Sequence, residues 1–126
     1  MHINIDVRSR VPIYEQLVYE IKQLAVLGLA EPDEKLPGVR QLSTELGINP
    51  NTVMKAYAQL EREGVIYTLA GKGSFITSDT ASVGDGHRKE LLKSLKNEAA
   101  KARDAGVSLE EAIAQLRTVY EGGNEL

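Results

Sequence analysis

The feature that most constrains this chain is a pair of helical segments separated by only three residues, 47–49. Apolar residues recur at helical spacing on both sides of this tripeptide. Gly47 suits the left-handed position that follows a helix, and Asn49 suits the cap that begins the next one. We therefore predict helices over about 39–46 and 50–63. A connection this short forces the two helices to cross steeply, which is typical of a helix-turn-helix.

Two β-forming segments follow this motif. Residues 65–69 and 74–77 are rich in β-branched and aromatic side chains, and the turn between them contains Gly71 and Gly73. The pattern predicts a β-hairpin, and a hairpin directly after a helix-turn-helix is a wing. An earlier amphipathic helix begins at Pro12. The expected fold class is mainly α: a winged helix-turn-helix of three helices plus a β-hairpin wing, followed by a two-helix tail.

The rest of the chain predicts a separate helical tail. We expect residues 1–77 to form the winged domain, residues 78–86 a small polar linker and residues 87–126 a two-helix dimerisation tail. His87, beside the linker, is expected to be solvated. The tail helices carry more apolar surface than their mutual contact covers, so either the winged domain or a second copy must cover the rest. A second copy is the expected partner, because homodimers are the commonest solution. The predicted dimer interface contains Leu91, Leu95, Ile113, Leu116 and Tyr120.

Composition excludes several classes of function. The chain has no cysteine and only two histidines, which rules out disulfides, thiolate metal sites and three-histidine metal sites and fits a cytoplasmic location. We therefore expect no metal and no cofactor. No apolar run approaches the roughly 18 residues of a membrane span, so no membrane partner is expected. No nucleophile, base and orienting acid form a defensible pattern, so we do not expect an enzyme.

Charge alone does not indicate a nucleic-acid partner. Fifteen basic residues stand against 18 acidic ones, a net charge of −3. Because DNA-binding domains are usually basic, any such function must depend on where the cations lie. The outer face of the 50–63 helix carries Asn51, Thr52 and Lys55, which are side chains that can contact base edges or phosphates in a major groove. Helix capping is the alternative role for its polar N-terminal residues, and for Asn49 it is the favoured one.

Two further cations are placed where DNA contact would explain them. Arg40 falls in the first turn of its helix, where a positive charge opposes the helix dipole. Lys72 stands between Gly71 and Gly73 at the hairpin tip, and glycines allow close approach of the backbone to another surface. The alternatives are a solvated or salt-bridged arginine and a simple tight turn with an exposed lysine.

Several motifs with fixed spacing resemble the GntR family of bacterial transcriptional regulators. They are Pro12-Ile13-Tyr14-Glu15-Gln16-Leu17, Lys35-Leu36-Pro37-Gly38-Val39-Arg40-Gln41-Leu42, Leu46-Gly47-Ile48-Asn49-Pro50-Asn51-Thr52-Val53, Ala56-Tyr57 with Leu60-Glu61, and Gly71-Lys72-Gly73-Ser74-Phe75. The short tail is similar to that of the small YtrA type. The resemblance implies a repressor that binds double-stranded DNA at a palindromic operator as a homodimer.

By position, the resemblance assigns DNA contacts to Arg40, to Asn49, Asn51 and Thr52, and to the wing-tip residue Gly71. Met54 stands where many relatives have arginine, which removes a guanine contact. Two other functions remain open. The same regulator could respond to a small-molecule effector, although nothing in the sequence indicates one, or the winged domain could bind a protein and not DNA.

Overall fold

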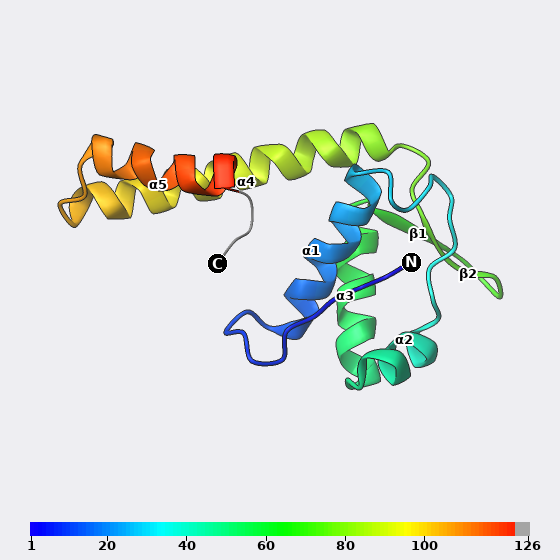
Figure 1. Ribbon diagram of the computed structural model, residues 1–126. Coiled ribbons are helices and arrows are strands. Elements are labelled where there is room, and N and C mark those ends of the chain that lie inside the picture. The colour runs from blue at the N-terminus through cyan, green and yellow to red at the C-terminus, as the bar shows by residue number, and fades with distance from the viewer. Residues whose placement is uncertain (123–126) are drawn as a thin grey trace. The chain divides into compact units, whose positions relative to one another are not determined.

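The computed structural model describes residues 1–122 (Figure 1). The chain divides into two compact units, Met1–His87 and Arg88–Leu126. Each unit is described by itself. The elements in chain order are α1 (Ile13–Val26), α2 (Val39–Leu46), α3 (Pro50–Arg62), β1 (Ile66–Leu69), β2 (Gly73–Ile76), α4 (Thr80–Asp104) and α5 (Leu109–Gly122). The mainly helical fold class with a two-stranded wing is therefore confirmed.

The core of the first unit lies between α1 and α3, which run side by side in Figure 1. Leu17 and Ile21 from α1 and Val53 and Leu60 from α3 are fully buried. Residues spaced by three and four positions form one face of each helix, so both apolar stripes point inward. Lys22 is also buried, and its ammonium forms an ion pair with the carboxylate of Glu63 just after α3. The ion pair joins the two central helices at the end of α3.

The turn between α2 and α3 has the predicted form. Gly47 adopts a left-handed conformation with φ of 67°, and the Ile48 N–H donates to the Ser43 carbonyl at 3.0 Å. The Asn49 side chain caps α3 by accepting the Asn51 N–H at 2.8 Å. A residue with a β-carbon is strained at positive φ, so glycine at 47 lets the chain reverse within three residues.

The wing is held on both edges of its second strand. β1 and β2 are antiparallel, with Ile66 opposite Ile76. On its other edge, β2 exchanges backbone hydrogen bonds with the segment before α2: Leu36 donates to the Ser74 carbonyl and Ile76 donates to the Glu34 carbonyl, each at 2.8 Å. The base of the hairpin is therefore fixed to the domain.

The predicted linker is wrong, because residues 80–86 belong to α4. Asp79 begins the helix: its carboxylate accepts the Ser82 N–H at 3.2 Å and the Ser82 hydroxyl at 2.7 Å, and these hydrogen bonds lower its pKa. This segment contains Gly84 and Gly86, and each glycine inside a helix weakens it by about 1 kcal/mol. Burial of Gly84 and His87, with Val83 packed against the core, offsets that loss. The expectation of a solvated His87 is also wrong, because His87 is buried.

The second unit consists of the remainder of α4 and of α5, connected by a four-residue turn. The expected capping box is present in α5: the Glu111 N–H donates to Ser108 Oγ at 3.1 Å and the Ser108 N–H donates to Glu111 Oε1 at 3.2 Å. Figure 1 shows α5 running back along α4. No described residue of α5 is buried within the single chain, so its apolar stripe lacks cover.

Candidate nucleic-acid interface

The first two turns of α3 present polar side chains to solvent opposite the buried stripe. Asn51 is exposed and Thr52 is half-buried, while Val53, Ala56 and Tyr57 are buried. Asn49 has its side-chain oxygen engaged in the helix cap. The amide of Asn51 and the hydroxyl of Thr52 can therefore meet a partner without disturbing the core.

Lys55 is exposed, but its ammonium already has a neighbour. Its Nζ lies 3.8 Å from the centre of the Tyr14 ring on α1. A cation over an aromatic face gains roughly 0.5–1 kcal/mol at an exposed site. The contact joins Lys55 on α3 to Tyr14 on α1, and Lys55 remains exposed.

Arg40 occupies the second position of α2 and is exposed. Within residues 1–122 its guanidinium makes no hydrogen bond or ion pair. The charge is therefore not explained by an internal partner, and it opposes the dipole of the helix. Its five donors remain available for an anion or a base edge.

The wing tip carries Gly71 and Lys72, both exposed. Gly71 has φ of 74°, and the Lys72 N–H closes the turn by donating to the Leu69 carbonyl at 2.9 Å. Gly73 also has a positive φ, of 112°, and a β-carbon there would lie 3.0 Å from Lys35 Cε. Glycine at 73 therefore fits a backbone conformation that other residues rarely adopt.

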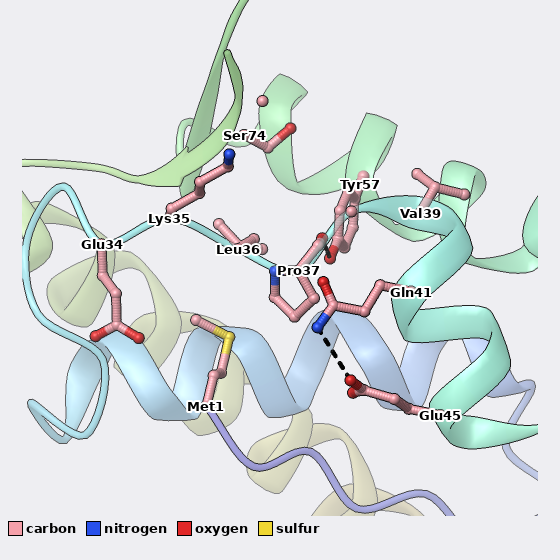
Figure 2. Close-up of a pocket in the computed structure, with 12 residues that line it drawn as sticks. Met1, Glu34, Lys35, Leu36, Pro37, Val39, Gln41, Glu45, Tyr57 and Ser74 are labelled. Carbon is pink, nitrogen blue, oxygen red and sulfur yellow. Dashed lines mark hydrogen bonds between the residues drawn. The ribbon is translucent and has the colours of Figure 1, made fainter.

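An open groove of about 770 Å³ lies between α2 and the wing (Figure 2). Its lining includes Val39 and Gln41, on either side of Arg40, and Gly73, next to Lys72. Neither Arg40 nor Lys72 is itself among the residues that line the groove. Its lining also carries both signs of charge: Glu34, Lys35 and Glu45, the last of which accepts a 3.1 Å hydrogen bond from Gln41. This mixture does not favour an anion inside the groove.

A buried tyrosine fixes the position of α2 relative to α3. The Tyr57 hydroxyl donates to the Pro37 carbonyl at 2.6 Å, two residues before α2 begins. Burial raises the pKa of this hydroxyl, and the nearby Glu45 carboxylate raises it further. Tyr57 therefore stays protonated and keeps its hydrogen bond at physiological pH.

Two sets of residues that position the site were not foreseen from the sequence. One is the Lys35–Leu36 segment, whose backbone holds the wing; it is too short to give a periodic signal. The other is His87, whose imidazole is hydrogen-bonded to the side chain of Gln23 on α1. Val83, His87 and Leu91 continue a four-residue spacing through the supposed linker, and that spacing could have revealed the longer helix.

The comparison with protein families is decisive. Residues 13–76 match the model of "Bacterial regulatory proteins, gntR family". This chain belongs to the GntR family. It is 42% identical to the HTH-type transcriptional repressor YtrA of Bacillus subtilis, with the similarity covering 98% of each chain.

Solved structures agree with this membership. A GntR family transcriptional regulator from Listeria monocytogenes superposes with a TM-score of 0.74 at 34% identity, covering 91% of this chain and 99% of that one. AraR(DBD) in complex with operator ORX1 gives a TM-score of 0.55 at 27% identity, covering 61% of this chain and 99% of that one. This GntR protein is therefore a DNA-binding transcription regulator with a winged helix-turn-helix, and not an enzyme. Within residues 1–122, no helix is both long and apolar enough to cross a membrane.

Proposed function

We propose that this GntR regulator is a repressor that binds a palindromic operator as a homodimer in the cytoplasm. The observation that carries the proposal is the two-sided character of α3: one face is fully buried, and the other presents Asn51 and Thr52 at the helix start. A helix that exposes amide and hydroxyl groups at its N-terminal end suits the major groove. The AraR complex supports DNA as the partner of such a domain.

Each remaining candidate has a role in this arrangement. Arg40 approaches a base edge or phosphate from the start of α2, and Lys72 with Gly71 brings the wing tip to the DNA backbone. Lys55 contacts a phosphate beside the groove that α3 enters, while Asn49 holds the helix start. Contacts to phosphates position the protein, and contacts to base edges give sequence preference.

The uncovered tail supports a homodimer. Ile113 and Leu116 on α5 are each 40% exposed and Tyr120 is 79% exposed, while Leu91 and Leu95 on α4 are exposed as well. A row of large apolar side chains on both helices of a small unit is a typical association surface. A second copy would cover it with the same residues, as two-fold symmetry requires. Two DNA-binding domains held in this way would read half-sites about 34–36 Å apart.

Selection of bound duplexes from a random DNA library tests the proposal. The wild-type protein should enrich a sequence with two-fold symmetry at moderate salt. Arg40→Ala should bind that sequence more weakly by about 1–3 kcal/mol, because a side chain at a base edge contributes that much. Arg62→Ala is the matched control, because Arg62 is also an exposed arginine but lies at the C-terminal end of α3, opposite to Asn51 and Thr52. If folded, dimeric wild-type protein enriches no sequence, the proposal fails in favour of an effector requirement or a protein partner.

A further inference from the structure

The DNA-facing side of α3 carries an apolar side chain that the proposed contacts do not use. Met54 is 55% exposed, although Val53 and Ala56 near it in the helix are fully buried. Residues three or four positions away share its face of the helix. Three of these four residues, Pro50, Asn51 and Ala58, are exposed, and the fourth, Tyr57, is buried. Met54 is therefore part of the outward surface and contributes nothing to the core.

The position of Met54 along the helix matters as much as its exposure. It is the fifth residue of α3, one turn beyond the Asn49 cap, and it follows Asn51 by three residues. When the N-terminal end of a helix enters the major groove, residues of its first two turns reach base edges. In the proposed binding mode, on which this inference rests, Met54 therefore faces the bases next to those that Asn51 contacts.

The chemistry of methionine limits what it can recognise there. Its thioether is no hydrogen-bond donor and only a weak acceptor, so it cannot make the paired contacts that arginine makes to guanine. The C5-methyl group of thymine is the apolar group that a base pair presents in the major groove. An unbranched, flexible side chain adapts its shape to such a group. Beside cytosine, adenine or guanine, the same side chain would cover polar atoms without satisfying them.

We propose that Met54 reads a thymine in each half of the operator through contact with its methyl group. Met54 is then a specificity-determining residue. It selects an A·T pair at one position per half-site and does not fix the position of the protein along the DNA. The preference depends on one methyl group, which provides a direct chemical test.

The test replaces thymine by deoxyuridine, one position at a time, in the operator recovered by selection. Deoxyuridine retains every hydrogen bond of thymine and lacks only the methyl group. For the wild-type protein, one such replacement per duplex should weaken binding about threefold to fivefold, the value expected for one buried methyl group. Replacing both symmetric thymines should weaken binding about tenfold to twentyfold.

Variants at position 54 connect this weaker binding to the side chain. Met54→Ala should bind the thymine and deoxyuridine duplexes equally well, whereas Met54→Leu should retain a preference for thymine. Leu29→Ala is the control, since Leu29 is also exposed and apolar but lies beyond α1; it should keep the full wild-type preference. Met54 is exposed, so neither substitution at this position should affect folding.

The possible failures are distinct. If the wild-type protein binds its operator but no deoxyuridine replacement weakens binding, the role of Met54 is overturned and the proposed function stands. The same holds if Met54→Ala remains as sensitive to the methyl group as the wild type. If no duplex is bound with any sequence preference, both proposals are overturned.

Discussion

His87 Nε2 lies 2.8 Å from Gln23 Oε1, in a hydrogen bond that joins α4 to α1 across 64 positions of the sequence. The imidazole is 5% exposed, and its ring centre is 5.6 Å from that of Tyr19. The first two turns of α4 are therefore part of the DNA-binding unit. The helix that leads to the second unit therefore starts within the first unit and not at the end of a flexible linker.

The first prediction concerns this attachment. His87→Ala removes a buried hydrogen-bond partner of Gln23 and the ring against Tyr19, so the free energy of unfolding should fall by about 1–3 kcal/mol. Denaturant unfolding measures the change. His2→Ala is the control, because His2 is exposed, and it should alter stability by less than about 0.5 kcal/mol. Equal stability of His87→Ala and the wild type would show that this hydrogen bond does not hold α4.

The sequence predicts the fold well where periodicity and capping agree. The stripe of α3, the left-handed Gly47 and the Ser108–Glu111 capping box are all present. It fails over residues 78–86, because the glycines and small polar residues there favour a loop, and the four-residue spacing of Val83, His87 and Leu91 is a weaker signal. Propensity is a weak guide when burial opposes it.

The candidate interface could likewise be predicted only in part from the sequence. Exposure of Arg40 and Asn51 agrees with the expected outward faces of α2 and α3. The contact of Lys55 with the Tyr14 ring could not be foreseen, because it depends on how α1 packs against α3. The hydrogen bond from Tyr57 to Pro37 joins residues 20 positions apart and has no local signal either.

A pH dependence of stability follows from Glu63. Burial would raise the pKa of its carboxyl group, but hydrogen bonds from Lys22 and Gln59, with the nearby positive charges, outweigh burial and lower the pKa below its ordinary value of 4.5. A carboxyl group whose pKa is lower in the folded state stabilises the protein at pH values above its unfolded-state pKa. That contribution is lost as the pH falls from about 4.5 through the lower folded-state pKa.

Glu63→Gln should therefore be less stable than the wild type at pH 7, and the difference should shrink as the pH falls below about 4.5. Urea unfolding at a series of pH values measures it. Glu61→Gln, at an exposed position near the end of α3, should differ from the wild type by less than about 0.5 kcal/mol at pH 7. A constant difference between Glu63→Gln and the wild type from about pH 7 to about pH 3 would contradict the lowered pKa.

The wing makes a separate prediction. If Lys72 contacts the DNA backbone, Lys72→Ala should weaken binding to operator and random duplexes by a similar factor. The slope of log affinity against log salt should also decrease in magnitude by about one for each phosphate that the variant no longer neutralises. Fluorescence anisotropy between about 50 and 200 mM salt measures both effects. A weaker preference for the operator, with the salt slope unchanged, would instead assign base recognition to the wing.

The tail predicts the oligomeric state. Leu116→Asp places a carboxylate in the apolar face of α5, where burial against a second copy would cost several kcal/mol, so the variant should sediment as a monomer. It should retain the wild-type unfolding of the first unit and bind the operator weakly. Leu29→Asp introduces the same charge at an exposed position outside the tail and should remain dimeric. A stable Leu116→Asp dimer would place the interface elsewhere.

The most direct test of the account is the stoichiometry on DNA, measured by sedimentation equilibrium. Two duplexes of equal length are compared: the symmetric operator, and one with a single half-site scrambled. Two protomers should bind the symmetric duplex together, and scrambling one half-site should weaken binding by about a hundredfold or more, because the second domain of the dimer then has no half-site to bind. A single protomer on the symmetric duplex, or equal affinity for both duplexes, would contradict a homodimer that reads a palindrome.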